Sequence, residues 1–449
     1  MELNKNDRVR LTVDGQTLQG QGVAHVDTLA VFVPAAAVGD VLDVQIVKRA
    51  KTHAFARIVE IREPSPHRIP NDCPAYPRCG GCVFRHLSYA EELRVKRQAV
   101  VDALQRLAGL TPRVHSILPA PATERYRNKA QFPLANTPDG VVAGFYGARS
   151  HRVIPCADCR LQPPEFAPLL QTLLEHANEH HILAYDERDR TGLLRHLFLR
   201  KSAATGQTQV CLVATDWRIP QMDALAEKLR AAAELSGILL NRNRRDTNVI
   251  LGEKCRTHWG EGLLTDTLGG LSLSLSPLSF YQVNHLQATH LYALATQAAA
   301  LTGAETVLEL YCGTGVLGLG MARHCARLIG ADIVPAAIEN ARANAARADI
   351  RNAEFLCADA TAAAANIERA DVVLLDPPRG GCGADLVRTV SGLSPVRVVY
   401  VSCDAATFAR DCAFFCDAGY TLRSVTPVDM FPRTGHVEMV GVLEKTTSR

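Results

Sequence analysis

The sequence has no apolar run of the roughly 18 residues that a helix needs to cross a bilayer. The opening stretch, MELNKNDRVR, is also not followed by the apolar core of a secretory signal peptide. We therefore expect neither a membrane span nor a signal sequence, and we expect a cytoplasmic location.

The sequence also has little excess of one charge sign over the other, and its cysteines are sparse. Lys and Arg number 49 against 46 Asp and Glu, so the formal net charge is only +3, which permits a polyanionic partner without requiring one. The 14 cysteines among 449 residues are too dilute for the disulfide framework of a secreted domain. Cysteines that do cluster are therefore better interpreted as metal ligands or catalytic groups.

Hydrophobic periodicity divides the first part of the chain into two domains. Residues 1–62 alternate apolar and polar residues in short runs such as GVAHV and DVLDVQIV, which predicts a small OB-like β-barrel. Residues 63–277 begin with a Pro-rich linker and continue without a repeat, which predicts a mixed α+β central domain. Within this range, helical spacing predicts a helix over 88–110, capped by Ser88 and ending near Gly109, that packs on the C-terminal domain.

From residue 278 to 449, strands such as ETVLELY and DVVLLDPP alternate with Ala-rich helices. This alternation is typical of a doubly wound, Rossmann-like α/β domain with a mainly parallel sheet.

A glycine-rich loop, ELYCGTGVLGLG, follows the first strand of that sheet. Gly313, Gly315 and Gly318 match the G-x-G-x-x-G pattern of dinucleotide sites, but the same turn also builds adenosylmethionine sites. Asp332 ends the next strand, where it could accept hydrogen bonds from ribose hydroxyls. Asp359 ends the third strand, where it could lie near an adenine amine. The loop alone leaves open a nicotinamide cofactor, adenosylmethionine, or a turn that binds nothing.

Two further elements end at the same sheet edge. LLDPPRGG places Asp376 after the fourth strand, in an Asp-Pro-Pro turn common in methyltransferases that act on planar bases, although a rigid turn with a solvated acid is the alternative. YVSCDAATFARD places Cys403 after the fifth strand, where it could be a packing residue, a metal ligand or a nucleophile. Because carboxyl ends of parallel strands share one edge, the three elements should converge on one crevice.

Five motifs together resemble the RNA uracil-C5 methyltransferase family, in particular its 23S ribosomal RNA branch: YVSCDAATFARD, LLDPPRGG, ELYCGTGVLGLG, SFYQVN and DMFPRTGHVE. The resemblance implies a class I methyltransferase domain, an N-terminal TRAM domain and a central domain to which ERYRNKAQFPL and NRNRRDTNVILG are similar. Three positions depart from the family pattern: Asp404 stands where Asn is expected, Asp332 where Glu is expected, and Val316 where relatives offer a polar contact.

The chemistry of that family requires an activated uracil. C5 is a poor nucleophile until a thiolate adds to C6, and a base must afterwards remove the C5 proton. Cys403 is the expected nucleophile and Glu438 the expected base, while Phe280 is expected near the uracil. The resemblance assigns S-adenosylmethionine binding to Gln282, Tyr311, Gly313, Gly315, Val316, Asp332, Asp359 and Asp376.

A second cysteine cluster has the spacing C-x5-C-x2-C in Cys73, Cys79 and Cys82. Zinc usually takes its ligands as two close pairs, whereas an iron–sulfur cluster accepts one distant cysteine. The segment IPCADCRLQ offers Cys156 and Cys159, and the family resemblance selects Cys159 as the fourth ligand of a [4Fe–4S] cluster. The spacing differs from the C-x3-C-x2-C of radical enzymes, so we expect a structural or RNA-facing role.

A nucleophile that approaches the face of a uracil needs the base flipped out or presented by a loop. Basic groups that could contact RNA phosphates, or could simply be solvated surface, are Lys48, Arg49 and Lys51, then Arg125, Arg127 and Lys129, and finally Arg242, Arg244 and Arg245.

The sequence thus predicts a monomeric, adenosylmethionine-dependent uridine C5-methyltransferase of 23S ribosomal RNA. A transfer RNA uridine is the alternative substrate, although such relatives usually lack the barrel and the cysteine cluster. An NAD-linked iron–sulfur oxidoreductase would account for the glycines and clustered cysteines but not for Cys403 or Glu438. A non-catalytic RNA-binding protein is the third interpretation.

Overall fold

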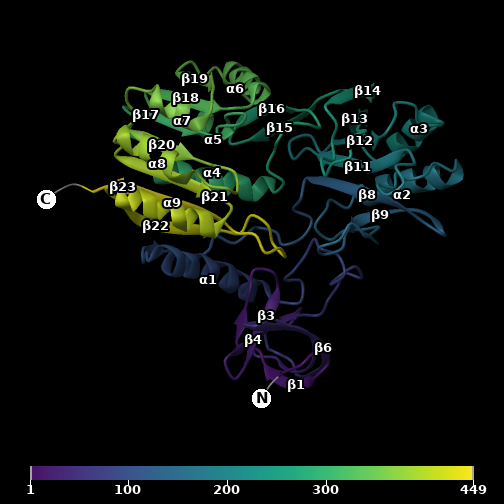
Figure 1. The fold of residues 1–449 in the computed structure, drawn as a ribbon. Helices are drawn as coiled ribbons and strands as arrows, with labels where there is room; N and C mark the ends of the chain where they lie inside the picture. The colour runs from purple at the N-terminus through teal and green to yellow at the C-terminus, as the bar shows by residue number, and fades with distance from the viewer. Residues whose placement is uncertain (1–2, 447–449) are drawn as a thin grey trace.

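The computed structural model describes residues 3–446, which form a small β-domain, a central domain and a larger α/β domain (Figure 1). The N-terminal strands build one strongly curled sheet in the order β1-β5-β6-β4-β3-β2. Their bounds are β1 (Arg8–Thr12), β2 (Gly15–Gln16), β3 (Gln21–Val26), β4 (Leu29–Pro34), β5 (Val41–Arg49) and β6 (His53–Glu63). Alternate residues such as Leu42, Val44 and Ile46 point into its core, as the period-two pattern predicts.

The central domain is a seven-stranded sheet in the order β10-β9-β8-β11-β12-β13-β14. Helices α2 (Phe166–Glu179) and α3 (Met222–Ala232) share an apolar core with it. The strands are β8 (Lys129–Thr137), β9 (Gly140–Tyr146), β10 (Val153–Pro155), β11 (Leu194–Lys201), β12 (Thr208–Ala214), β13 (Leu235–Arg242) and β14 (Lys254–Gly260).

The C-terminal domain contains an eight-stranded sheet in the order β19-β18-β17-β20-β21-β23-β22-β7. Strands β17 to β21 run parallel to one another, and β23 runs antiparallel between β21 and β22. The bounds are β7 (Arg113–Val114), β17 (Thr306–Leu310), β18 (Arg327–Asp332), β19 (Ala353–Cys357), β20 (Val372–Leu375), β21 (Arg397–Ser402), β22 (Tyr420–Val428) and β23 (Glu438–Lys445).

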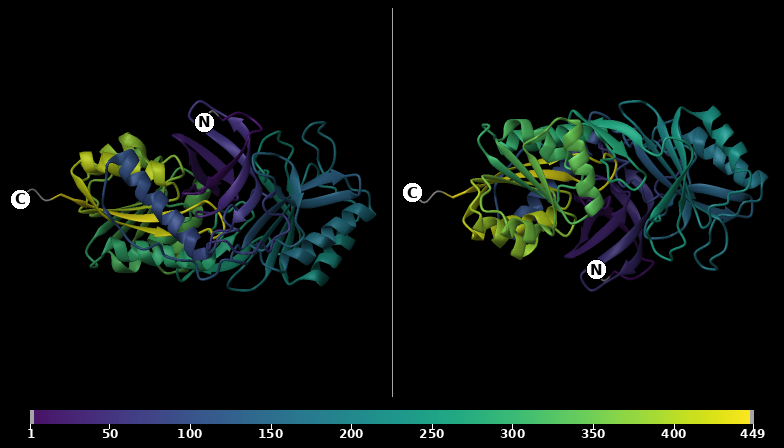
Figure 2. Two further views of the ribbon diagram at one scale, coloured as in Figure 1. Left: turned by 90° about the horizontal axis from the view of Figure 1, so that it is seen from below. Right: turned by 90° about the horizontal axis from the view of Figure 1, so that it is seen from above.

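Helices cover both faces of this sheet, so two apolar cores lie on its opposite sides (Figure 2). One core receives α4 (His285–Ala299), α5 (Val316–Met321) and α6 (Pro335–Arg347), with the 3-10 turn η1 (Ala322–His324) after α5. The other receives α7 (Ala360–Ala365), α8 (Gly383–Gly392) and α9 (Ala405–Asp417). The doubly wound α/β architecture expected from the alternating pattern is therefore present.

Besides β7, a helix and a hairpin from the central stretch of sequence pack on the C-terminal domain. Helix α1 (Tyr89–Ala108) begins with Ser88, whose side chain accepts from the Glu91 amide, and ends at Gly109 with φ 67°, as predicted. Its Val100 and Leu104 join the core of the sheet. The hairpin of β15 (Leu264–Leu268) and β16 (Leu271–Leu275) buries its leucines in the opposite core.

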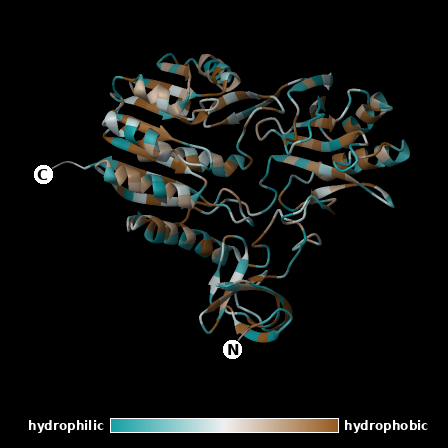
Figure 3. Cartoon of the chain, in the orientation of Figure 1, coloured by the Kyte–Doolittle hydropathy of each residue, from teal (hydrophilic) through white to brown (hydrophobic). Residues whose placement is uncertain are grey.

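Hydropathy agrees with this layered arrangement. Apolar and polar residues are interleaved along the helices (Figure 3), as expected where one helix face meets a sheet and the other meets water. None of the helices described within residues 3–446 has the length and apolar composition that crossing a bilayer requires.

Candidate functional site

Cys403 and Glu438 emerge at the same edge of the C-terminal sheet. Strands β21 and β23 are antiparallel neighbours, and Ser402 is paired with Met439. Cys403 is the residue after Ser402, and Glu438 is the first residue of β23, so the two side chains arise from adjacent positions. Cys403 is half-buried and Glu438 is buried.

Asp376 and Arg379, which follow the neighbouring strand β20, complete an electrostatic cluster with these two residues. Burial raises the pKa of Glu438 to about 8, with a further contribution from Asp376, while Arg379 opposes the shift. Burial also raises the pKa of Asp376 to about 7. Burial, Glu438 and Asp376 raise the pKa of the Cys403 thiol, and Arg379 again opposes the shift. Asp376 and Arg379 therefore influence the protonation of Cys403 and Glu438.

The loop that carries Arg379 is fastened to helix α9. The Thr407 hydroxyl donates to the Arg379 carbonyl at 3.2 Å, and the Cys382 amide donates to Asp411 Oδ2 at 2.7 Å. Arg379 Nη2 lies 3.1 Å from Nδ1 of His436, two residues before Glu438. Sequence reasoning missed Arg379, although its place directly after the two prolines of LLDPPRGG was a signal.

The glycine loop lies between β17 and α5 at the same edge. The Gly313 amide donates to Asp332 Oδ2 at 2.9 Å, so Asp332 is held beside the loop. Gly315 has φ +76°, and a Cβ there would lie 2.9 Å from the Phe355 ring. A Cβ on Gly318 would lie 2.2 Å from the Glu309 carboxylate. Two of the glycines are thus required by the packing of the loop itself.

Glu309, which opens the segment ELYCGTGVLGLG, is a residue that sequence reasoning missed. It is buried, its Oε1 accepts from the Gly318 amide at 3.1 Å, and burial raises its pKa to about 8. Its Oε2 has no hydrogen-bond partner among the described residues.

The other expected cofactor positions lie around this loop. Tyr311 is half-buried with φ +63°, Val316 is the buried first residue of α5, and Asp359 is exposed and caps α7 through Oδ1. Gln282 lies on the loop before α4 and interacts with Tyr292, a residue that no sequence signal identified. Burial raises the pKa of the Tyr292 hydroxyl, and the nearby Asp376 and Glu438 raise it further.

The surface beside Asp332 fits an adenosine. Ile333 and Val334 directly follow this acid and are 66% and 50% exposed, so apolar surface lies beside a carboxylate that could accept ribose hydroxyls. The open space around Gly313, where a Cβ would meet nothing within 4 Å, leaves room for a ligand at the strand end. Together with the orphaned Glu309 oxygen, these features match the mixed polar and apolar character of S-adenosylmethionine.

Comparison with known proteins identifies the family. The model of the tRNA (uracil-5-)-methyltransferase family matches residues 88–446, and the TRAM domain model matches residues 2–59. The chain belongs to the tRNA (uracil-5-)-methyltransferase family. It is an S-adenosylmethionine-dependent RNA uracil-5 methyltransferase, so the expected class I fold, TRAM domain, methyl donor and RNA substrate are confirmed. The interpretations as an NAD-linked oxidoreductase or a non-catalytic RNA-binding protein are set aside.

Full-length relatives support this assignment. The chain is 41% identical to an uncharacterized RNA methyltransferase of Halalkalibacterium halodurans over 98% of both proteins. It is 38% identical to one of Listeria monocytogenes, again over 98% of both. Among solved structures, the Pyrococcus abyssi tRNA (uracil-54, C5)-methyltransferase in complex with S-adenosyl-L-homocysteine superposes with a TM-score of 0.78 and 27% identity, covering 97% of this chain and 100% of its own.

In this uracil-5 methyltransferase, five cysteines from two segments line one cavity of about 60 Å³. Its cysteines are Cys73, Cys79, Cys82, Cys156 and Cys159. The Cys79 segment reaches the central domain through a β-bridge to Gly147, and the Gly81 amide donates to Cys79 Sγ at 3.4 Å. Among residues 3–446, no group of three or more His, Cys, Asp or Glu side chains could hold a metal ion.

The basic groups expected to contact RNA differ in their surroundings. Lys48, Arg49 and Lys51 are exposed on the TRAM domain. Arg125 is paired with Asp158 and donates to the Cys159 carbonyl, so it braces the cysteine turn.

The remaining basic residues lie in the central domain. Arg244 and Arg245 are exposed and paired with Asp216 and Glu253, and Arg242 stacks over Trp217 at 5.1 Å. Lys129 is half-buried, and burial lowers its pKa to about 8.

Proposed function

We propose that this enzyme methylates C5 of a uridine in 23S ribosomal RNA through a covalent bond between Cys403 Sγ and C6. The observation that carries the proposal is the adjacent placement of Cys403 and Glu438 at the sheet edge, with Arg379 and Asp376 beside them. The ribosomal substrate is supported by the resemblance of the five motifs to the 23S branch. We keep a cytoplasmic location and a monomeric state as predictions.

A transfer RNA uridine is the second candidate substrate. The Pyrococcus structure supports this alternative, because that protein is a tRNA methyltransferase and its structure matches 97% of this chain. The few unmatched residues of this chain are fewer than its N-terminal barrel contains, so the match includes the barrel. The barrel alone therefore does not separate the two substrates, although we expect that tRNA relatives usually lack it.

The proposed reaction uses the chain's own groups in a fixed order. Cys403 adds as a thiolate to C6, forming the S–C6 bond and shifting electron density to C5. S-adenosylmethionine supplies an electrophilic methyl group, which C5 takes as the C–S⁺ bond breaks. Glu438 then removes the proton from C5, and the electron pair expels the Cys403 thiolate. Bond formation and cleavage balance, so the enzyme is regenerated once Glu438 loses its proton to water.

Both catalytic groups must be deprotonated to act. Glu438 has a pKa of about 8 because it is buried, and burial also raises the pKa of Cys403. The active forms therefore increase as the pH rises toward 8 and above, and we expect the rate to rise over the same interval.

The test separates the order of the two steps. Glu438→Gln keeps the side-chain shape without its basicity, so addition and methyl transfer should proceed and elimination should stall. On a denaturing gel with labelled RNA, this variant should show a slow band that is absent from Cys403→Ala and from the double variant. A band that survives loss of Cys403 would assign another nucleophile, and wild-type turnover by Glu438→Gln would assign another base.

Comparing 23S fragments with tRNA transcripts in the same assay identifies the substrate. Methylation of tRNA alone would overturn the ribosomal assignment while leaving the chemistry intact.

We further propose that Cys73, Cys79, Cys82 and Cys159 hold a [4Fe–4S] cluster. The thiols line one cavity, and the buried Nε of Arg127, which also lines it, has no hydrogen-bond partner among residues 3–446. A cation beside the thiolates would offset their charge. When bound, the cluster would crosslink the linker to the central domain.

Anaerobic purification tests the cluster. The wild type should contain about four irons and four sulfides per chain, and Cys159→Ser should lose them. Cys156→Ser is the matched control, since Cys156 lines the same cavity, and it should retain them. Zinc in place of iron, or loss in the control alone, would overturn the assignment.

A further inference from the structure

The loop of residues 429–437 connects β22 to β23 and ends at Glu438. Its two ends lie side by side, because Val428 pairs with Glu438. The loop therefore leads directly into the residue that we propose removes the C5 proton.

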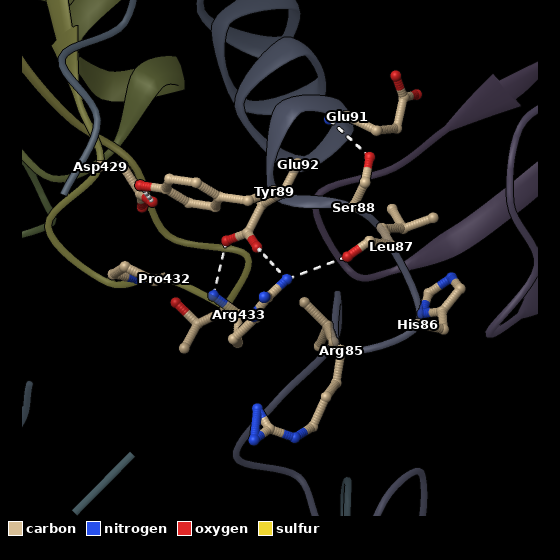
Figure 4. Close-up of polar contacts among 12 residues, drawn as sticks. Arg85, His86, Leu87, Ser88, Tyr89, Glu91, Glu92, Asp429, Pro432 and Arg433 are labelled. Carbon is tan, nitrogen blue, oxygen red and sulfur yellow. Dashed lines mark hydrogen bonds and ion pairs between the residues drawn. The ribbon is translucent and has the colours of Figure 1, made fainter. Parts of the chain in front are cut away.

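Lys96, in the first half of helix α1, is fully buried against this loop. Its Nζ donates to Glu92 Oε1 at 2.7 Å, to Asp429 Oδ1 at 2.7 Å and to the Phe431 carbonyl at 3.1 Å. The three donors of the ammonium group are thus all used. The Tyr89 hydroxyl donates to the other oxygen of Asp429 at 2.7 Å (Figure 4).

Glu92 holds the middle of the same loop through Arg433. The Arg433 amide donates to Glu92 Oε1 at 2.6 Å, and its Nη1 lies 3.6 Å from Glu92 Oε2. The same Nη1 donates to the Leu87 carbonyl at 3.0 Å. Figure 4 shows the Arg433 side chain between Glu92 and Leu87. Arg433 has φ 70°, a conformation that L residues adopt only where the surroundings hold them.

The other domains contact the loop at the same place. The Arg433 carbonyl accepts from the amides of Val83 and Phe84, which directly follow the cysteine segment. The Tyr126 hydroxyl of the central domain donates to the Pro432 carbonyl at 2.9 Å.

The TRAM domain also approaches the loop. A Cβ on Gly435 would lie 1.8 Å from the Leu18 carbonyl, so backbone meets backbone there.

The charges of this network balance, since Lys96 and Arg433 oppose Glu92 and Asp429, and all four are buried. Removing charges from water is costly, and a well-packed apolar set would stabilise the fold at least as well. What directed ionic contacts add is a defined geometry. Here they fix a loop that has no regular secondary structure against a rigid helix.

We propose that Glu92, Lys96 and Asp429 are positioning residues that hold the 429–437 loop so that Glu438 meets the C5 proton. The inference rests on the proposed function of Glu438. It predicts a defect in one step, elimination, rather than a general loss of activity.

The experiment compares Glu92→Gln with Glu91→Gln on the same helix. Glu91 is also buried and ion-paired, but its contacts are with Ser88, Arg94 and His67 rather than with the loop. Single turnovers with labelled RNA and saturating S-adenosylmethionine, quenched onto a denaturing gel, give the ratio of covalent adduct to released product. Glu92→Gln should raise this ratio and lower kcat on the order of tenfold to 100-fold, with an unchanged Kd for S-adenosylmethionine. Glu91→Gln should keep the wild-type ratio.

If Glu92→Gln does not fold, the charge-balanced variant Lys96→Met with Asp429→Asn tests the positioning role instead. It removes one charge of each sign and should also accumulate adduct. If adduct and product decrease together in Glu92→Gln and in the charge-balanced variant, the network is merely structural and the positioning role is overturned. Glu438→Gln is the reference, and if it alone accumulates adduct, the proposed function stands without the positioning role. If Glu438→Gln forms no adduct, the base assignment fails and the positioning role falls with it.

Discussion

Arg379 is the cation that lies beside the proposed catalytic pair, Cys403 and Glu438. It opposes the upward pKa shifts of both Cys403 and Glu438, which burial and the neighbouring carboxyls produce. Its backbone is held by Thr407 and its guanidinium approaches His436, so the charge has a defined place. A cation near a thiol and a carboxyl favours the deprotonated forms that the proposed reaction needs.

Arg379→Met should therefore raise both pKa values further and move the acid limb of the pH–rate profile to higher pH by about one unit. The measurement is kcat at saturating RNA between pH 6 and 9.5. Arg379→Lys retains a cation and should keep a limb close to that of the wild type. A limb that stays in place in Arg379→Met would mean that this charge does not control the ionisations that limit the rate.

The turn between β17 and α5 shows how an element depends on single backbone positions. Gly315, at the start of α5, combines a left-handed φ with contact to Phe355, whereas a Cβ on Gly320 within that helix would meet no atom of another element within 4 Å. The first glycine is required by geometry, and the second is an ordinary helical position where alanine is the better helix former.

Gly315→Ala should lower the free energy of unfolding by about 2 kcal/mol and weaken S-adenosylmethionine binding, because the loop must shift away from Phe355. Gly320→Ala should keep the affinity and stabilise the protein by up to about 1 kcal/mol. Thermal unfolding and calorimetric titration report both quantities. Equal behaviour of the two variants would contradict the role given to the Gly315 conformation.

At the scale of the whole molecule, the TRAM domain lies beneath the junction of the other two domains (Figures 1 and 2). Its exposed Lys48 and Arg49 are the last residues of β5, and exposed Lys51 follows that strand, in a different domain from the glycine loop. Phosphate contacts release counterions, so they appear in the salt dependence of RNA affinity.

Replacing these three residues with alanine should weaken RNA binding and reduce the salt slope by about two to three, while the Kd for S-adenosylmethionine stays unchanged. A variant in which alanine replaces Arg106, Arg351 and Arg388, which are exposed cations outside the TRAM domain, controls for the loss of three charges. Filter binding over a range of salt concentrations gives the slopes. An unchanged slope in the TRAM variant would refute phosphate contact there.

Sequence by itself determined the features that depend on neighbours along the chain. The period of two in the TRAM strands, the Ser88 cap and terminal Gly109 of α1, and the strand and helix alternation after residue 278 are local patterns, and the structure contains them all. The glycine and cysteine spacings likewise predicted where ligands could bind, because a turn or a metal site constrains residues a few positions apart.

Tertiary structure alone decided what depends on distant segments. Lys96 and Asp429 are 333 residues apart, and Glu92 and Arg433 are 341 apart, yet each pair is in contact. The pKa of Glu438 depends on burial and on Asp376 and Arg379, none of which a linear pattern encodes. Desolvation and charge proximity arise only when strands and helices pack. The sequence motif therefore identified Glu438, whereas its pKa is determined by the fold.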